Sequence, residues 1–502
     1  MIKTTPTETI IAIATATSEA GIGIVRLSGP LALSCADRCI TDQKHARTLA
    51  ERKPNTIQFG YVTDAEGNDV DEALISYMKA PHSYTGEDVV EINVHGGRFI
   101  LEKVLKTLLA ENKGRLRLAL PGEFTKRAFL NGKMDLSQAE AVQDMIAAES
   151  DFALTNAMRQ LRGDLRKLVT DMREQILHET AFLEAALDDP ENYNLDAYTD
   201  KLEPVLDELV CTLQNLMNTA EEGRIIKEGI RAAIIGKPNV GKSTLLNLLS
   251  GTDKAIVTDI PGTTRDVLSE NIRIGDLVLL VSDTAGLHET DDPVEKIGVE
   301  RALQYAKEAD LILAVLDLKD IICEFSKTEP AMDTKQEDMD LLSFVFEPEV
   351  LRCMRQKKCV IFLNKEDLIT DEQKTYAKKA LEKSLLKQGL SSNIKTITTS
   401  FLSSSLYQDE TVRFKQALYD LFLRDEFVNR GEYVLTNERH IQALLKAKES
   451  LILAKKTIRD GAGEDLLTVD LMDAYTALSS IIGENVEDDL ADRIFSKFCM
   501  GK

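Results

Sequence analysis

The sequence predicts three structural parts: an α+β domain at the N-terminus, an all-α helical domain split in sequence, and an α/β domain inserted into the helical one. Helical periodicity occupies two blocks far apart in the chain, and buried-strand patterns alternate with helical patterns between them. The expected boundaries are 1–130 for the N-terminal domain, 131–228 with 426–502 for the helical domain, and 229–425 for the inserted domain. Two independent terminal helical bundles are the alternative that periodicity leaves open.

Length and composition are those of a folded multidomain protein. The 502 residues suggest about three domains, and 43% hydrophobic content with 12 prolines argues against extensive disorder. The net charge of −22, from 83 acidic and 61 basic residues, disfavours broad non-specific binding to RNA or anionic membranes. An RNA substrate would therefore need a local basic patch or a basic partner.

The cysteines and the hydropathy predict a cytoplasmic protein. Seven cysteines are scattered without metal-type pairing, which is typical of reduced thiols. Cys35 and Cys39 lie four residues apart on an expected helix, 32–40, where packing explains both. The chain contains no apolar run of about 18 residues and no signal pattern at its start, so no membrane association is expected.

The first 130 residues mix strand and helix patterns. Asp64–Asn68 has the composition of a hairpin turn between two strands. Strands are expected at 9–14, 22–27, 56–62, 70–78 and 89–94, and a second helix at 99–109.

Helical periodicity starts at Asp135, where Gln138 three residues later resembles a capping box. A long helix through Leu161–Ile176 is expected to end by Pro190. Further helical spacing is found at 205–216 and, beyond the inserted domain, at 441–445 and 471–482.

A glycine-rich loop is the strongest functional signal in the chain. A buried strand, Ile230–Ile235, precedes the loop, and a helix follows it. Gly236 and Gly241 allow the backbone to turn so that successive N–H groups face phosphates. Lys242 would add a charge at the β- and γ-phosphates, and Ser243 an oxygen ligand to magnesium. The pattern predicts a phosphate-binding loop.

A second loop predicts guanine specificity. Asn364–Asp367 follows a buried strand, Cys359–Leu363. Asp367 can accept hydrogen bonds from the N1–H and exocyclic amine of guanine, which adenine does not offer, and the stem of Lys365 can lie along the base. At this distance after a phosphate loop, the motif indicates GTP.

Switch and metal elements lie between these two loops. The strand Leu277–Val281 leads into Asp283–Gly286, where Asp283 can hold the magnesium shell and the Gly286 amide can meet the γ-phosphate. Gly262–Asp266 contributes Thr264 as a second protein ligand to magnesium. Together the pieces predict a P-loop (Ras-like) GTPase domain of the α/β class. Residues 319–350 are polar and weakly periodic, and a surface insertion is expected there.

Motifs along the whole chain resemble the MnmE (TrmE) family of tRNA modification GTPases, including its split architecture. These motifs are Gly21–Gly29, Tyr84–Asp88, Pro121–Thr125, Asp135–Glu140 and Arg493–Lys502. The chain ends Cys-Met-Gly-Lys where the family usually has Cys-Ile-Gly-Lys, a substitution that conserves volume.

The resemblance implies a homodimer that forms a heterotetramer with MnmG, a partner that carries FAD. Together the two proteins of the family add a carboxymethylaminomethyl group to carbon 5 of the wobble uridine of certain tRNAs. The resemblance also implies a bound tetrahydrofolate one-carbon derivative, either 5-formyl- or methylene-tetrahydrofolate.

The folate residues are likewise implied by the resemblance, by motif position: Arg26, Glu91, Lys133 and Lys502. Glu91 can accept hydrogen bonds from a pterin, and the basic residues suit carboxylates of the folate or the polar edge of its ring. Cys499 is the implied catalytic cysteine, acting as a nucleophile or positioning the tail beside the folate.

Potassium and a second catalytic residue follow from the same resemblance. The implied potassium ligands are Asn239, Thr258, Ile260 and Thr263, and the ion would take the place of an arginine finger. Leu287 stands where Ras-like enzymes place a glutamine, and the resemblance points to Glu295, acting through a water. Magnesium is assigned to Ser243 and Thr264. The implied GTP-binding set is Asn239, Val240, Gly241, Lys242, Ser243, Thr244, Thr258, Asp259, Ile260, Pro261, Gly262, Thr263, Thr264, Asp283, Thr284, Ala285, Gly286, Asn364, Lys365 and Asp367.

Two other functions fit part of the pattern. A regulatory GTPase of ribosome assembly or signalling would show the same nucleotide motifs, and a folate-binding module could carry a degenerate GTPase. The last guanine-contacting loop is indeed degenerate around Thr398–Ser400. The Cys499 tail and the implied folate residues favour tRNA modification.

Overall fold

The chain divides into two compact units in a computed structural model. One unit comprises residues 1–147, 157–214 and 439–502, and the other comprises 148–156 and 215–438. The structure describes residues 8–42, 46, 49–51, 53–189, 198–250, 269–282, 303–327, 341–390, 394–400, 407–423, 433–461, 463–484, 488–496, 498 and 501. The first unit is therefore discontinuous in sequence, because it contains segments that lie before and after residues 215–438 of the second unit.

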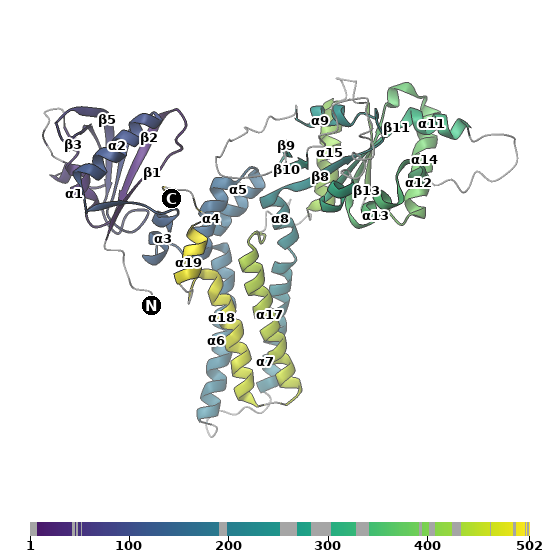
Figure 1. The fold of residues 1–502 in the computed structure, drawn as a ribbon. Helices are drawn as coiled ribbons and strands as arrows, with labels where there is room; N and C mark the ends of the chain where they lie inside the picture. The colour runs from purple at the N-terminus through teal and green to yellow at the C-terminus, as the bar shows by residue number, and fades with distance from the viewer. Residues whose placement is uncertain are drawn as a thin grey trace. The chain divides into compact units, whose positions relative to one another are not determined.

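A mixed sheet forms the N-terminal part of the first unit (Figure 1), with strand order β3-β4-β5-β6-β2-β1-β7. The strands are β1 Thr9–Ile13, β2 Ala20–Ser28, β3 Ile40–Thr41, β4 Ile57–Thr63, β5 Asp69–Met78, β6 Val89–Gly96 and β7 Leu116–Leu118. The helices are α1 Ala32–Asp37, η1 Leu49–Glu51, α2 Arg98–Glu111 and α3 Glu123–Leu130. Residues of α1 and α2 share one buried core with the sheet, in which Val25, Ile92 and Leu101 are fully buried.

The predicted strands of this part are confirmed, and so is the hairpin, where the Asp64 and Asn68 backbones are hydrogen bonded at 3.0 Å. The predicted helix 32–40 is too long. It ends at Asp37, because Ile40 pairs with Val62 as a strand residue instead.

The helical domain is built from both ends of the chain, as predicted. Its helices are α4 Leu136–Ala147, α5 Asp151–Arg162, α6 Asp164–Asp188, α7 Tyr198–Met217, α17 Glu438–Arg459, α18 Glu464–Ile482 and α19 Asp488–Phe495. The helix α6 packs beside α18, and α7 beside α17 (Figure 1), where Arg459 forms an ion pair with Glu203 at 2.9 Å. Among the described helices, none is long and apolar enough to cross a membrane.

The start of the helical domain was predicted only in part. The capping box is confirmed, because the Asp135 amide donates to Gln138 Oε1 at 3.0 Å and the Gln138 amide to Asp135 Oδ1 at 2.9 Å. The long helix expected through Leu161–Ile176 is confirmed as α6, but it begins at Asp164, and Leu161 belongs to α5. Gly163 adopts a left-handed backbone with φ of 95° and separates α5 from α6. Pro190 lies outside the described residues.

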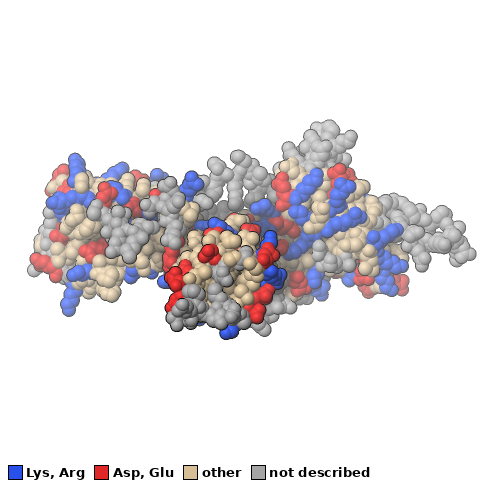
Figure 2. All heavy atoms as spheres, turned by 90° about the horizontal axis from the view of Figure 1, so that it is seen from below, with Lys and Arg blue, Asp and Glu red and all other residues tan. Residues whose placement is uncertain are grey.

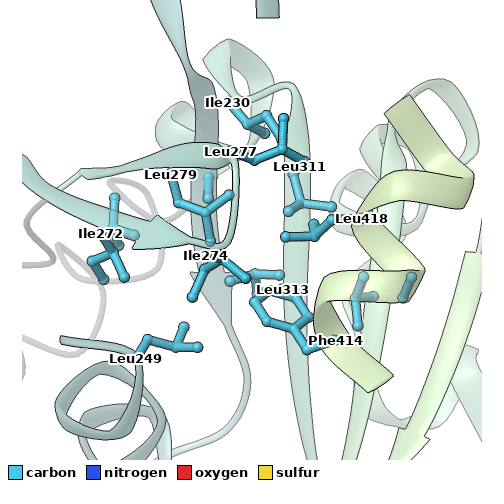
Figure 3. Packing of buried hydrophobic residues seen from close by; sticks show 14 of the residues in the cluster. Ile230, Leu249, Ile272, Ile274, Leu277, Leu279, Leu311, Leu313, Phe414 and Leu418 are labelled. Atoms are coloured by element: carbon cyan, nitrogen blue, oxygen red, sulfur yellow. The ribbon is translucent and has the colours of Figure 1, made fainter. Parts of the chain in front are cut away.

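The second unit has a largely parallel sheet of order β13-β12-β11-β8-β10-β9, in which only the pairing of β9 with β10 is antiparallel. The strands are β8 Ile230–Ile235, β9 Ser269–Ile274, β10 Leu277–Ser282, β11 Leu311–Asp317, β12 Lys358–Asn364 and β13 Ile394–Thr398. The helices are α8 Ala220–Glu228, α9 Lys242–Ser250, α11 Leu318–Lys327, α12 Leu341–Val345, α13 Pro348–Gln356, η2 Glu366–Leu368, α14 Asp371–Lys387 and α15 Tyr407–Phe422. Figure 3 shows one face of this sheet, where Leu279 and Leu313 pack against Phe414 and Leu418 of α15.

The region 319–350 is not simply a surface insertion. Its described ends form α11 and α12, and Ile321, Leu341 and Leu342 are buried in the core on the other face of the sheet. In this region a few apolar residues at helical spacing stand among many polar ones, so the sequence indicates an exposed segment. Those few apolar residues nevertheless pack against the sheet.

Candidate functional site

The loop between β8 and α9 is curled around a lysine side chain. Lys242 Nζ donates to the carbonyl oxygens of Gly236 at 2.8 Å and Lys237 at 2.9 Å. Burial lowers the pKa of Lys242 from its usual value. A Cβ atom on Gly236 would lie 2.5 Å from the Val315 carbonyl oxygen, so this position requires glycine. The ammonium group is thus held inside the loop, where anionic phosphates would bind.

The expected guanine loop is fastened to the phosphate loop. Asn364 Nδ2 donates to the Val240 carbonyl oxygen at 2.8 Å, and Lys365 Nζ donates to the Asn239 carbonyl oxygen at 3.0 Å. Asn239 and Lys365 both have left-handed backbones, with φ of 60° and 64°. Because these bonds join the two loops, the distance between a bound base and its phosphates is fixed before the nucleotide arrives.

Asp317, which the sequence did not point to, and Ser400, from the degenerate last guanine loop, hold the expected guanine loop in place. The Asp317 carboxylate, only 4% exposed, lies 2.6 Å from Lys365 Nζ. Ser400 Oγ donates to Asp367 Oδ1 at 2.6 Å and so orients the carboxylate expected to bind guanine. The only sequence signal for Asp317 is its position as the last residue of β11, whereas Ser400 belongs to the segment identified as the degenerate last guanine-contacting loop.

Ser243 and Thr244 lie in the first turn of α9. Many other expected site residues lie outside the described residues. These are 258–264, 283–286, Leu287, Glu295, Cys499 and Lys502.

Arg26 and Glu91 form the centre of a second candidate site, on the N-terminal sheet. They are directly paired across β2 and β6, and Arg26 Nε donates to Glu91 Oε1 at 2.8 Å. Arg26 Nη1 also donates to the Gly501 carbonyl oxygen at 3.1 Å, so the end of the chain reaches this pair. The guanidinium carbon lies 5.9 Å from the ring centre of Tyr84 and 5.6 Å from that of Phe124.

Lys133 is placed beside the same loop as Tyr84. Its Nζ donates to the Pro81 carbonyl oxygen at 3.0 Å, and a Cβ on Gly86 would lie 3.3 Å from the Lys133 side chain. The described contacts do not join Lys133 to Arg26 or Glu91. Tyr84 and Phe124, which belong to motifs of the resemblance, were absent from the predicted site although their rings border it.

A buried charge network supports these motifs. Arg127 has no exposed surface and lies 3.0 Å from Glu87 and 2.9 Å from Glu123. Burial opposes ionisation of Glu123, but hydrogen bonds from Arg117, the Leu120 amide and Arg127 outweigh it and lower its pKa to about 2. The network ties the loop at 84–88 to α3, and it was not predicted from the sequence.

A phosphate loop between β8 and α9, joined to an Asn-Lys-x-Asp loop after β12 on a parallel sheet, defines a P-loop GTPase. The family model described as the MnmE helical domain matches residues 136–499, and the one described as the GTP-binding protein TrmE N-terminus matches residues 9–133. The chain belongs to the MnmE family of tRNA modification GTPases.

Full-length relatives support the assignment. The chain is 42% identical over 498 residues to the tRNA modification GTPase MnmE of Lachnoclostridium phytofermentans, covering 99% of this chain and 100% of the relative. It is 40% identical over 495 residues to the MnmE of Clostridioides difficile and 39% identical over 497 residues to that of Carboxydothermus hydrogenoformans, covering 99% of each chain. The predicted family and the predicted enzyme, a GTPase that acts in tRNA modification, are thereby confirmed.

Proposed function

We propose that this chain is a potassium-dependent GTPase that acts with MnmG to add a carboxymethylaminomethyl group to carbon 5 of the wobble uridine of certain tRNAs. In this proposal the FAD partner joins a homodimer of this chain, and a tetrahydrofolate one-carbon derivative binds at the Arg26–Glu91 pair. GTP hydrolysis gates the modification through a conformational cycle.

The contact between Arg26 and the chain terminus carries the one-carbon part of the proposal. Gly501 is bound to Arg26 at 3.1 Å, and Cys499 and Lys502 are two and one residues from Gly501 in the sequence. Glu91 beside Arg26 suits a pterin, because a carboxylate accepts hydrogen bonds from amino and ring N–H groups. The rings of Tyr84 and Phe124 offer flat surfaces beside the same pair.

The phosphate loop supports the potassium and magnesium parts. Asn239 is exposed, and its side chain makes no hydrogen bond to a described residue, while its backbone is held by Lys365. Its amide oxygen is therefore available to a cation beside the phosphates, with Thr258, Ile260 and Thr263 as the further proposed ligands. Ser243 and Thr264 would hold magnesium, which accepts few protein ligands alongside phosphates and water.

The test of the modification replaces Cys499. Cells that lack this protein would be complemented with the wild-type chain or with Cys499→Ser, and their tRNA nucleosides measured by mass spectrometry. We expect loss of the modified wobble uridine in the serine variant, while GTP turnover of the purified variant stays within a few-fold of wild type. Normal modification in the variant would remove Cys499 from the active site.

The test of the potassium mechanism compares cations. Hydrolysis should be fast in potassium and much slower in sodium, whose smaller radius fits the proposed ligands poorly. Equal rates in the two salts would contradict the proposal, whatever the outcome for Cys499.

A further inference from the structure

The strongest unexplained feature outside these sites is a basic surface on α13 and α14. Although the whole chain carries a net charge of −22, α13 and α14 together contain seven basic and four acidic side chains. In Figure 2, many Lys and Arg side chains lie on the inserted domain, with Asp and Glu side chains among them. We define the basic face as the exposed residues Arg352, Arg355, Lys378, Lys379, Lys383 and Lys387.

The two helices are joined near their C-terminal ends. Both pack on the same core through Leu351 and Leu381. Their C-terminal ends meet, because Arg355 is hydrogen bonded to Gln388, the residue that follows Lys387. Basic side chains near the C-terminal ends of α13 and α14 can therefore contact the same bound molecule.

Helix dipoles do not account for this charge. A basic residue stabilises a helix mainly within its last turn, and only Arg355 and Lys387 lie in the last turns of α13 and α14. Lys379 and Lys383 lie further inside, four residues apart on one side of α14, where like charges repel each other. Glu382 makes no ion pair with a described residue that would relieve this repulsion.

The position of the basic face leaves the nucleotide loops free. The nucleotide loops follow the C-terminal ends of β8 and β12. The helix α13 ends just before β12 begins, and so at the opposite edge of the sheet. The helix α14 starts near the nucleotide edge and runs toward that opposite edge. A polyanion on the basic face would not compete with GTP for its site.

We infer that the basic face binds the phosphate backbone of tRNA. The family acts in tRNA modification, and the net charge of −22 disfavours broad non-specific RNA binding by the chain as a whole. Exposed lysines and arginines spaced along one edge suit successive phosphates, to which they give affinity without base specificity. The inference does not depend on the proposed carboxymethylaminomethyl chemistry.

The test measures tRNA binding by the full chain as a function of salt. Fluorescence anisotropy would use a labelled tRNA transcript with uridine at the wobble position. The test variant combines Arg352→Gln, Lys379→Gln and Lys383→Gln, and a control with the same charge change combines Lys103→Gln, Lys113→Gln and Lys167→Gln, all exposed residues of the other unit.

If each of the three side chains contacts one phosphate, the slope of log affinity against log salt should fall by about 2–3, and affinity near 0.15 M salt by roughly 100-fold. GTP turnover and thermal stability should be retained, and the control should bind like wild type. Unchanged affinity and slope in the test variant would refute the inference, and so would an equal loss in the control. Wild-type binding to vesicles of phosphatidylcholine and phosphatidylserine without binding to tRNA would refute it in favour of a membrane surface.

Discussion

Guanine recognition is expected to depend on a single carboxylate, Asp367. Ser400 orients this carboxylate at 2.6 Å. Changing Asp367 to Asn replaces an acceptor by an amide that pairs better with xanthine, so GTP affinity should fall by about 2–4 kcal/mol. Titrating the variant with GTP and XTP measures both effects. Wild-type GTP affinity in Asp367→Asn would show that this loop does not bind the base.

Glu295 is the residue expected to orient the attacking water, since Leu287 has no hydrogen-bonding group. Glu295→Ala should lower the turnover of GTP by roughly 100- to 1,000-fold, the usual scale for a positioned acid–base group. The dissociation constant for GTP, measured separately, should change little. An unchanged turnover would eliminate Glu295 from the mechanism.

The sequence identifies the residues expected to contact the nucleotide more readily than the residues that hold those side chains in position. Asn364, Lys365 and Asp367 belong to a motif of fixed spacing, so they were found. Ser400 reaches this loop from the segment identified as the degenerate last guanine loop, whereas Asp317 reaches it from β11, and only the order of strands in the sheet brings Asp317 there. A partner such as Asp317 leaves no local pattern in a single sequence.

At the scale of elements, the charge network under α3 should make the N-terminal domain sensitive to acid. The pKa of Glu123 falls from 4.5 to about 2 in the folded chain. Its carboxylate therefore contributes stability above pH 4.5, and that contribution is lost as the pH falls toward 2. Hydrogen exchange of the α3 amides should accelerate over this range in the wild-type protein.

Glu123→Gln tests the same network at neutral pH. Removing one partner of a buried ion pair costs on the order of 3 kcal/mol, so exchange of α3 should accelerate strongly. Glu102→Gln, which removes an exposed partner of Arg98, is the control and should leave exchange unchanged. Equal protection of α3 in both variants would contradict a stabilising role for the network.

Most elements were predictable because their periodicity is strong, and the misses have local causes. Gly163 interrupts an apolar pattern that continues on both sides, so the pattern alone indicated one helix. The short helices α11 and α12 bury Leu318, Ile321, Leu341 and Leu342, but the many polar residues elsewhere in 319–350 hide this apolar signal in the sequence.

At the scale of the whole molecule, an apolar area on the N-terminal sheet supports the proposed homodimer. Phe59 and Leu74 are paired across β4 and β5 and are 43% and 47% exposed, and Ile57 on β4 is 73% exposed. Burying such a patch between two copies would stabilise association. We expect Phe59→Glu to give a monomer by analytical ultracentrifugation, whereas Leu466→Glu, at an exposed site on α18, should remain a dimer.

The insertion of one unit within the other sets an order of events during synthesis. The helices α6 and α7 leave the ribosome before residues 215–438, while their packing partners α17 and α18 follow that segment. At about 5–20 residues per second, the apolar faces of α6 and α7 wait roughly 10–45 s for their partners. If the inserted domain folds quickly, it brings α17 and α18 near α6 and α7, so the helices pair sooner. If it folds slowly, the apolar faces of α6 and α7 stay exposed to chaperones and to aggregation.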